Sequence, residues 1–265
     1  SSRSVQAAQG GSQLAILPAL APATRTPFQP LPTSTVTQTP TITPSPTATP
    51  IPPTETPTAT PLPTDTPAPT EETWPPTSAM ISNIYGYPQY YSLDCEARSA
   101  VDLASYFGLA IDELDFLDRM PLSSDPDEGF VGSFYDPRGQ VPPNSYGVHA
   151  APVANLLREY GLNTAAAKGM SYDTIRSEIA SGRPVMVWVI NNTLSGYPVS
   201  YTAPNGNTTT VAAYEHTVLA IGYDPYYVTL LDGSMVYQRS VDLFLASWGV
   251  LGNMGITVGD PSILN

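Results

Sequence analysis

The stretch "YYSLDCEARSAVDLASYFG" (residues 90–108) contains the only cysteine of the chain, Cys95, and predicts a helix that begins at this residue. Asp94 occupies a position that favours helix initiation, and Gly108 one at which helices end. Between them, apolar residues recur with helical spacing at Ala97, Val101, Ala104 and Phe107. Unpaired backbone N–H groups and the helix dipole stabilise a thiolate at such a position, so we expect the pKa of Cys95 to be lowered.

Around this helix the chain divides into two parts of unlike composition. Residues 1–80 hold 18 of the 30 prolines and include the Thr/Pro tract "TPTITPSPTATPIPPTETPTATP". Such a tract cannot bury enough apolar surface to fold, so we expect a disordered linker or stalk with polyproline II character. Residues 81–265 have the composition of a globular domain and are long enough for one sizeable core.

Charge and composition exclude several classes of partner. The domain at 81–265 carries 19 acidic and 8 basic residues, a net charge of −11. This charge repels the phosphate groups of nucleic acids and anionic lipids. We expect no membrane span, because no apolar run reaches 18 residues, and no internal disulfide, because there is one cysteine. A stalk and a first residue other than Met predict an extracellular or cell-surface protein, secreted or anchored through an upstream segment and associated with the cell envelope.

The rest of the domain predicts helices followed by strands. Helical spacing occurs in residues 111–120, 151–161, 171–182 and 240–249, and β-branched or aromatic runs occur in residues 183–192, 214–224, 226–233 and 253–259. This order favours the α+β class with an antiparallel sheet. Two irregular segments, 121–147 and 191–214, are expected to form the walls of a cleft.

Three reactive side chains are predicted to meet on this layout. His216 lies in one strand and Asp232 ends the next, and antiparallel pairing brings such residues together on one face. With Cys95 they would form a nucleophile, a base and an orienting carboxylate. Asp224, in a turn, and Asp242, at a helix start, have structural reasons to be acidic. Taken singly, the three reactive residues also have structural interpretations: a core cysteine, a strand histidine and a turn aspartate.

The sequence around these residues resembles that of the C39-like peptidases, which have a papain-like cysteine protease fold. The resemblance covers residues 85–258. It rests on Gln89 shortly before the helix-opening Cys95, "SGRPVMVWV" (181–189), "EHTVLAIGYD" (215–224) and "LLDG" (230–233). It implies the papain-like fold, with N-terminal helices followed by an antiparallel sheet.

The same resemblance implies a cysteine peptidase that acts on a peptide or protein without a cofactor or metal. Cys95 would attack the peptide carbonyl, His216 would carry the proton, Asp232 would hold the imidazole, and Gln89 would complete the oxyanion hole. Glu96 stands where many relatives have Gly, and its charge would oppose a thiolate if it pointed inward. Two alternatives stay open: a catalytically inactive binding module displayed on a stalk, and a transpeptidase or acyltransferase of the same fold.

Other candidate residues are expected to be structural. His149 has no acidic neighbour in the sequence and is predicted at the surface or as a helix cap. Asp125, Asp127 and Glu128 are predicted in a solvated turn, because the glycine that follows is misplaced for a calcium loop. Two distant histidines and one cysteine give no support to a zinc site.

Overall fold

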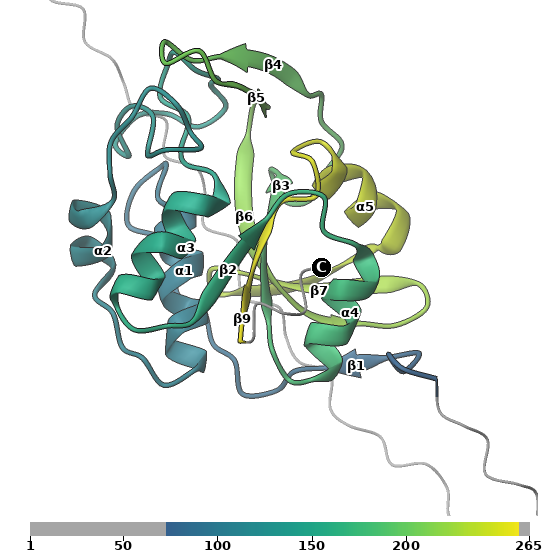
Figure 1. Ribbon diagram of the computed structural model, residues 1–265. Helices are drawn as coiled ribbons and strands as arrows, with labels where there is room; N and C mark the ends of the chain where they lie inside the picture. The colour runs from purple at the N-terminus through teal and green to yellow at the C-terminus, as the bar shows by residue number, and fades with distance from the viewer. Residues whose placement is uncertain (1–72, 260–265) are drawn as a thin grey trace, which may run out of the picture. The chain divides into compact units, whose positions relative to one another are not determined.

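The computed structural model describes residues 73–259 (Figure 1), so most of the stalk expected at 1–80 lies outside the described residues. No helix among residues 73–259 is both long enough and apolar enough to cross a membrane. In chain order the elements are β1 (Ala79–Met80), α1 (Cys95–Tyr106), α2 (Glu113–Arg119), α3 (Ala150–Glu159), β2 (Thr164–Ala167), α4 (Tyr172–Ala180), β3 (Val185–Ile190), β4 (Val199–Thr202), β5 (Thr208–Val211), β6 (Glu215–Tyr223), β7 (Tyr227–Asp232), β8 (Met235–Ser240), α5 (Val241–Gly249) and β9 (Gly255–Val258).

A seven-stranded antiparallel sheet occupies the centre of the domain. Its strand order is β2-β9-β3-β6-β7-β8, with β1 paired to β6, while β4 and β5 form a separate hairpin. Strand β6 is buried along its whole length. Figure 1 shows α1, α2 and α3 on one side of the sheet and α4 and α5 on the other. The predicted α+β class with an antiparallel sheet is therefore confirmed.

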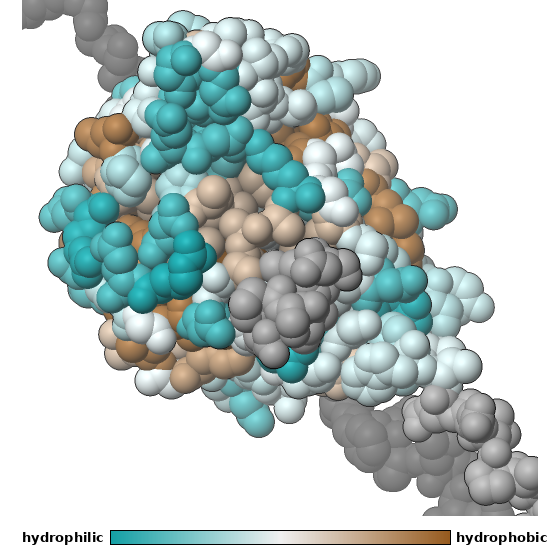
Figure 2. Space-filling view, in the orientation of Figure 1, coloured by the Kyte–Doolittle hydropathy of each residue, from teal (hydrophilic) through white to brown (hydrophobic). Residues whose placement is uncertain are grey.

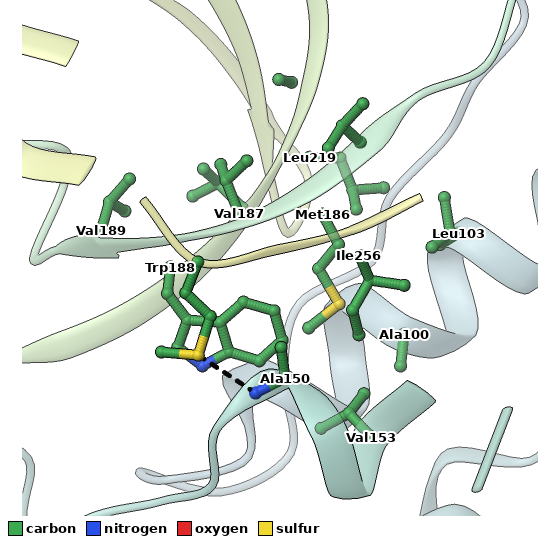
Figure 3. Packing of buried hydrophobic residues seen from close by; sticks show 14 of the residues in the cluster. Ala100, Leu103, Ala150, Val153, Met186, Val187, Trp188, Val189, Leu219 and Ile256 are labelled. Carbon is green, nitrogen blue, oxygen red and sulfur yellow. Dashed lines mark hydrogen bonds between the residues drawn. The ribbon is translucent and has the colours of Figure 1, made fainter. Parts of the chain in front are cut away.

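The core between α1, α3 and the sheet is built around Trp188 of β3 (Figure 3). Its indole N–H donates to the backbone oxygen of Val148 at 2.9 Å, so the polar atom of this fully buried ring has a partner. Ala100 of α1 and Val153 of α3 are fully buried in the same cluster. On the face drawn in Figure 2, hydrophobic residues form small areas separated by hydrophilic ones. Most large apolar side chains among the described residues are buried in the core, where each contributes about 1.5–3 kcal/mol.

The start of α1 is connected to the segment before it through Asp94. This residue is at the N-cap, as predicted, but its side chain makes no bond to the helix. Instead Oδ2 accepts the backbone N–H groups of Tyr90 and Tyr91 at 2.8 and 2.7 Å. The side chain therefore holds the segment that carries Gln89 against the beginning of the helix.

The folded part begins earlier than the boundary expected at Ile81. Strand β1 pairs with Gly222 and Tyr223 of β6. The backbone oxygen of Pro76 accepts bonds from the Tyr223 hydroxyl at 2.8 Å and from Arg176 at 3.2 Å. A two-residue strand is too short to show an alternating pattern, which explains why composition placed the boundary too late.

Candidate active site

His216 and Asp232 are in direct contact, with His216 Nε2 2.8 Å from Asp232 Oδ1. In the antiparallel pairing of β6 with β7, Leu219 lies opposite Leu231, which brings the end of β7 beside the start of β6. The hydroxyl of Tyr237 reaches the other oxygen of Asp232 at 3.5 Å. The second ring nitrogen, His216 Nδ1, is buried and has no hydrogen-bond partner within residues 73–259. The imidazole is therefore held through Nε2, and its Nδ1 is left without a hydrogen bond in the described part of the chain.

The two competing aspartates lie at a turn and at a helix start, as predicted. Asp224 Oδ1 accepts the backbone N–H groups of Tyr226 and Tyr227 at 2.7 and 2.8 Å, and so shapes the turn between β6 and β7. Asp242 lies in the first turn of α5. Asp232, which was predicted in preference to these two, is the aspartate that contacts the histidine.

Cys95 is the first residue of α1, and its side chain is buried. Its Sγ–H donates to Glu96 Oε2 at 3.2 Å, and no hydrogen bond joins it to His216. Burial, together with the nearby charges of Glu96 and Glu215, raises the pKa of Cys95 well above its usual value, although the backbone N–H of Thr217 acts in the opposite direction. The expected lowering of this pKa is wrong, because loss of hydration and two carboxyl groups outweigh the helix dipole.

Two buried carboxyl groups lie beside the thiol. Glu96 Oε1 accepts the backbone N–H of Val148 at 2.6 Å, whereas neither carboxyl oxygen of Glu215 has a partner in the described part of the chain. Cys95 Sγ and one carboxyl oxygen each of Glu96 and Glu215 lie within 4.8 Å of one another. Among residues 73–259, this is the one group of three side chains whose atoms are close enough to bind a metal ion together. Burial raises the pKa of Glu96 to about 7 and that of Glu215 well above its usual range. Glu215 gave no signal in the sequence, because nothing local relates it to Glu96.

Gln89 lies in the same pocket as the histidine and aspartate. Its side-chain Nε2 donates to the backbone oxygens of Tyr91 at 2.7 Å and Ser92 at 3.3 Å. The pocket has a volume of about 290 Å³ and is lined by Pro88, Gln89, Arg138, Asn192, His216 and the turn 232–235. Arg138 and Asn192 come from the two irregular segments that were expected to form the cleft walls. Cys95 is not among the lining residues.

A close approach of two glycines brings Gln89 to this pocket. A Cβ atom added to Gly86 would lie 2.1 Å from the backbone oxygen of Gly233. The lack of a side chain at Gly86 therefore lets the chain before α1 pass directly against the turn that follows Asp232.

The residues expected to be structural form a second buried group. His149 is at the N-cap of α3, one of the two predicted positions, but it is fully buried and not at the surface. Its side chain makes no capping bond, and its Nδ1 lies 2.6 Å from Asp127 Oδ1. Lys168 Nζ also lies 2.6 Å from this oxygen. Asp125 is buried and accepts bonds from two asparagine side chains, Asn205 and Asn207, so a solvated turn is wrong for this residue. The partners lie far away along the chain, where local sequence reasoning does not detect them.

The fold and the site together define a class. A cysteine at a helix start, with a histidine and an aspartate on adjacent strands of an antiparallel sheet, is the arrangement expected of a C39-like domain with a papain-like fold. Residues 77–256 match the Peptidase_C39 like family, and the chain belongs to this family.

Two relatives illustrate the range of this similarity. The chain is 27% identical over 199 residues to the uncharacterized protein YvpB of Bacillus subtilis (strain 168), covering 69% of this chain and 75% of YvpB. A crystal structure of a Bacillus anthracis protein assigned to the C39-like peptidases is similar with a TM-score of 0.61 and 22% identity, covering 69% of this chain and 98% of that one. The structural similarity supports the fold.

Proposed function

We propose that the domain is a cysteine peptidase that cleaves peptide bonds through Cys95, His216 and Asp232. The contact between His216 and Asp232 carries this proposal, because it leaves Nδ1 as the ring atom that can exchange a proton. The Cys95 thiol proton passes to Nδ1, and Sγ attacks the carbonyl carbon of the peptide. Asp232 stabilises the imidazolium that forms.

The second half of the reaction uses the same groups. The imidazolium gives its proton to the leaving amine as the C–N bond breaks, and a thioester to Cys95 remains. Water, deprotonated by His216, then hydrolyses this thioester and restores the thiol. Gln89, which faces the same pocket, would turn its amide from the Tyr91 carbonyl to the oxyanion, opposite the backbone N–H of Cys95.

We also propose an extracytoplasmic location, with the Thr/Pro-rich segment expected within residues 1–80 as a linker or stalk. The support is compositional: proline and threonine dominate this segment, and an extended chain of that kind spans about 3.1 Å per residue. Display on a spacer would place the peptidase near protein or peptide substrates of the cell envelope.

Digestion of a peptide library tests the activity. The wild-type protein is expected to cleave a subset of the peptides, and Cys95→Ala and His216→Ala are expected to cleave none. Products joined to an added amine would instead indicate a transpeptidase. Retention of uncleaved peptides by the wild type would indicate the inactive binding module, which the raised pKa of Cys95 favours.

A further inference from the structure

The carboxyl groups of Glu96 and Glu215 converge on one point, above Gly147. This glycine has a φ of +125°, and a Cβ atom added to it would lie 2.2 Å from Glu96 Oε1 and 3.0 Å from Glu215 Oε2. Both glutamates are almost completely buried, at 1% and 4% exposure. Two carboxyl groups from α1 and β6 therefore meet where water is excluded and where only a glycine fits.

Among residues 73–259, no positively charged side chain is hydrogen-bonded or ion-paired to either glutamate. The ionisable groups that act on it are Asp94 at the N-cap of α1, Cys95 at the start of α1, and Tyr146 from the loop before α3. His216, the next residue of β6, is hydrogen-bonded to Asp232 and to neither glutamate. Two buried carboxylates without a cation cannot both stay ionised, so at least one proton must reside on the pair.

We propose, building on the proposed peptidase function, that the Glu96–Glu215 pair carries at least one proton and that the two glutamates act as positioning residues that set the ionisation of Cys95. With one proton, the pair is negative, and Glu96 Oε2 accepts the Cys95 S–H bond. With a second proton, taken up from solvent, the pair is neutral, and the Glu96 hydroxyl donates to Sγ. The first state holds a thiol, and the second stabilises a thiolate whose own proton has moved to His216.

The two states predict opposite reactivity of the thiol. A negative pair 3.2 Å from Sγ disfavours a second negative charge there, whereas a neutral pair with a hydrogen-bond donor favours it. Since the pKa of Glu96 is about 7, the neutral pair dominates on the acid side of this value. Alkylation of Cys95 is therefore expected to have a component that falls as the pH rises through about 7.

Alkylation by iodoacetamide, followed by mass spectrometry of the full chain, measures the reactivity of Cys95, because it is the only thiol. The measurement does not depend on peptidase activity. Glu96→Gln and Glu215→Gln replace a titrating carboxyl group with a neutral amide. In Glu96→Gln the amide can still accept the Val148 N–H and donate to Sγ. Both variants are expected to react at least about 10-fold faster than wild type at pH 8, which corresponds to a difference of one pKa unit.

A matched control is Glu178→Gln in α4, which changes a carboxyl group that is equally buried but is paired with Arg183, a residue of the segment after that helix. Its alkylation profile is expected to follow that of the wild type. The proposal is overturned if the profiles of both pair variants coincide with that of the wild type, or if the variants react more slowly at pH 8. Protection of Cys95 by added Zn²⁺ that is lost in Glu215→Gln would also overturn it, in favour of a bound cation.

Infrared spectroscopy of the wild type gives a second measurement if a variant fails to fold. A protonated carboxyl band is expected to persist at pH 8, and its absence would contradict a protonated Glu96–Glu215 pair. The peptidase proposal fails separately: a protein whose thiol responds to the pair as described, but which cleaves no peptide, refutes the function and leaves the pair intact. Peptide cleavage by a protein whose alkylation profile is the same in wild type and in both pair variants supports the peptidase function and refutes the role of the pair.

Discussion

His216 is oriented through a single atom, because its Nε2 contacts Asp232 while Nδ1 contacts no group in the described part of the chain. A carboxylate in this position fixes the tautomer as well as the ring plane, since Nε2 must carry the proton that it donates. The nitrogen that can accept a proton is then Nδ1. The identity of one residue at the end of β7 thus decides which ring atom can act as the base.

Asp232→Asn is expected to lower kcat/KM by roughly 10²- to 10⁴-fold, because the amide favours the wrong tautomer and cannot stabilise an imidazolium. Asp224→Asn and Asp242→Asn are expected to retain most of the activity, since neither carboxylate reaches the histidine. Initial rates on one peptide from the library compare the three variants. A dead Asp224→Asn variant beside an active Asp232→Asn variant would show that the orienting role is misassigned.

Between elements, α1 and β6 are fixed to each other by two hydroxyl groups. Ser99 Oγ donates to the backbone oxygen of Thr217 at 3.2 Å, and Thr217 Oγ1 donates to Ser99 Oγ at 3.0 Å. Cys95 lies one turn before Ser99, and His216 directly precedes Thr217. The position of the thiol relative to the histidine strand therefore depends on how this helix docks on this strand.

Gly86→Ala is expected to reduce activity and to destabilise the fold by about 1–3 kcal/mol, because the new Cβ collides with the Gly233 backbone and displaces the segment that carries Gln89. Gly249→Ala is the control, since the nearest atom to its Cβ is a side-chain oxygen at 3.6 Å. Thermal unfolding and initial rates measure both effects. An active and equally stable Gly86→Ala variant would contradict the role given to the close approach.

The elements with a clear hydrophobic pattern could be predicted from the sequence, including α2 and the four-residue β9, whereas β1, β2, β4, β5 and β8 could not. The helix at Cys95 and the strand at His216 show clear spacing, and their order along the chain gave the fold class. Strand β8 alternates exposed and partly buried residues at a sheet edge, and β1 has two residues, so neither shows a clear hydrophobic signal. The pKa of Cys95 was predicted in the wrong direction because burial and the long-range neighbour Glu215 are properties of the assembled fold.

The stability of the whole domain is expected to fall as pH rises from about 5 to 8. The pKa of Glu96 rises from 4.5 in the unfolded chain to about 7 in the folded one, so its contribution is complete below pH 4.5 and is lost through pH 7. The loss for this group is on the order of 3 kcal/mol. Urea unfolding at about pH 5 and at about pH 8 measures the change in the free energy of unfolding. In Glu96→Gln this free energy is expected to depend less on pH. Equal stability of the wild type at the two pH values would contradict a protonated Glu96.

The N-terminal limit of the domain can be tested by truncation. A chain that begins at Thr73 is expected to unfold at the temperature of the full chain. A chain that begins at Ile81 loses β1 and the bonds to Pro76 and is expected to unfold several degrees lower, since about 1 kcal/mol corresponds to roughly 2–4 °C in a domain of this size. Equal melting temperatures of the two shortened chains would show that β1 adds no stability.

Cys95 in α1 and the strand β6 that packs against this helix lie far apart along the chain, so they are synthesised at different times. Thr217 follows Ser99 by 118 residues, so α1 leaves the ribosome long before the strand that buries Cys95. Until then the thiol is open to oxidants and has no partner for an intrachain disulfide, because the chain has one cysteine. A disulfide-linked dimer of this protein, separable by a reducing agent, would therefore consist of molecules whose Cys95 was oxidised before β6 packed against α1. The fraction of such dimers would measure how often newly synthesised chains are oxidised before they fold.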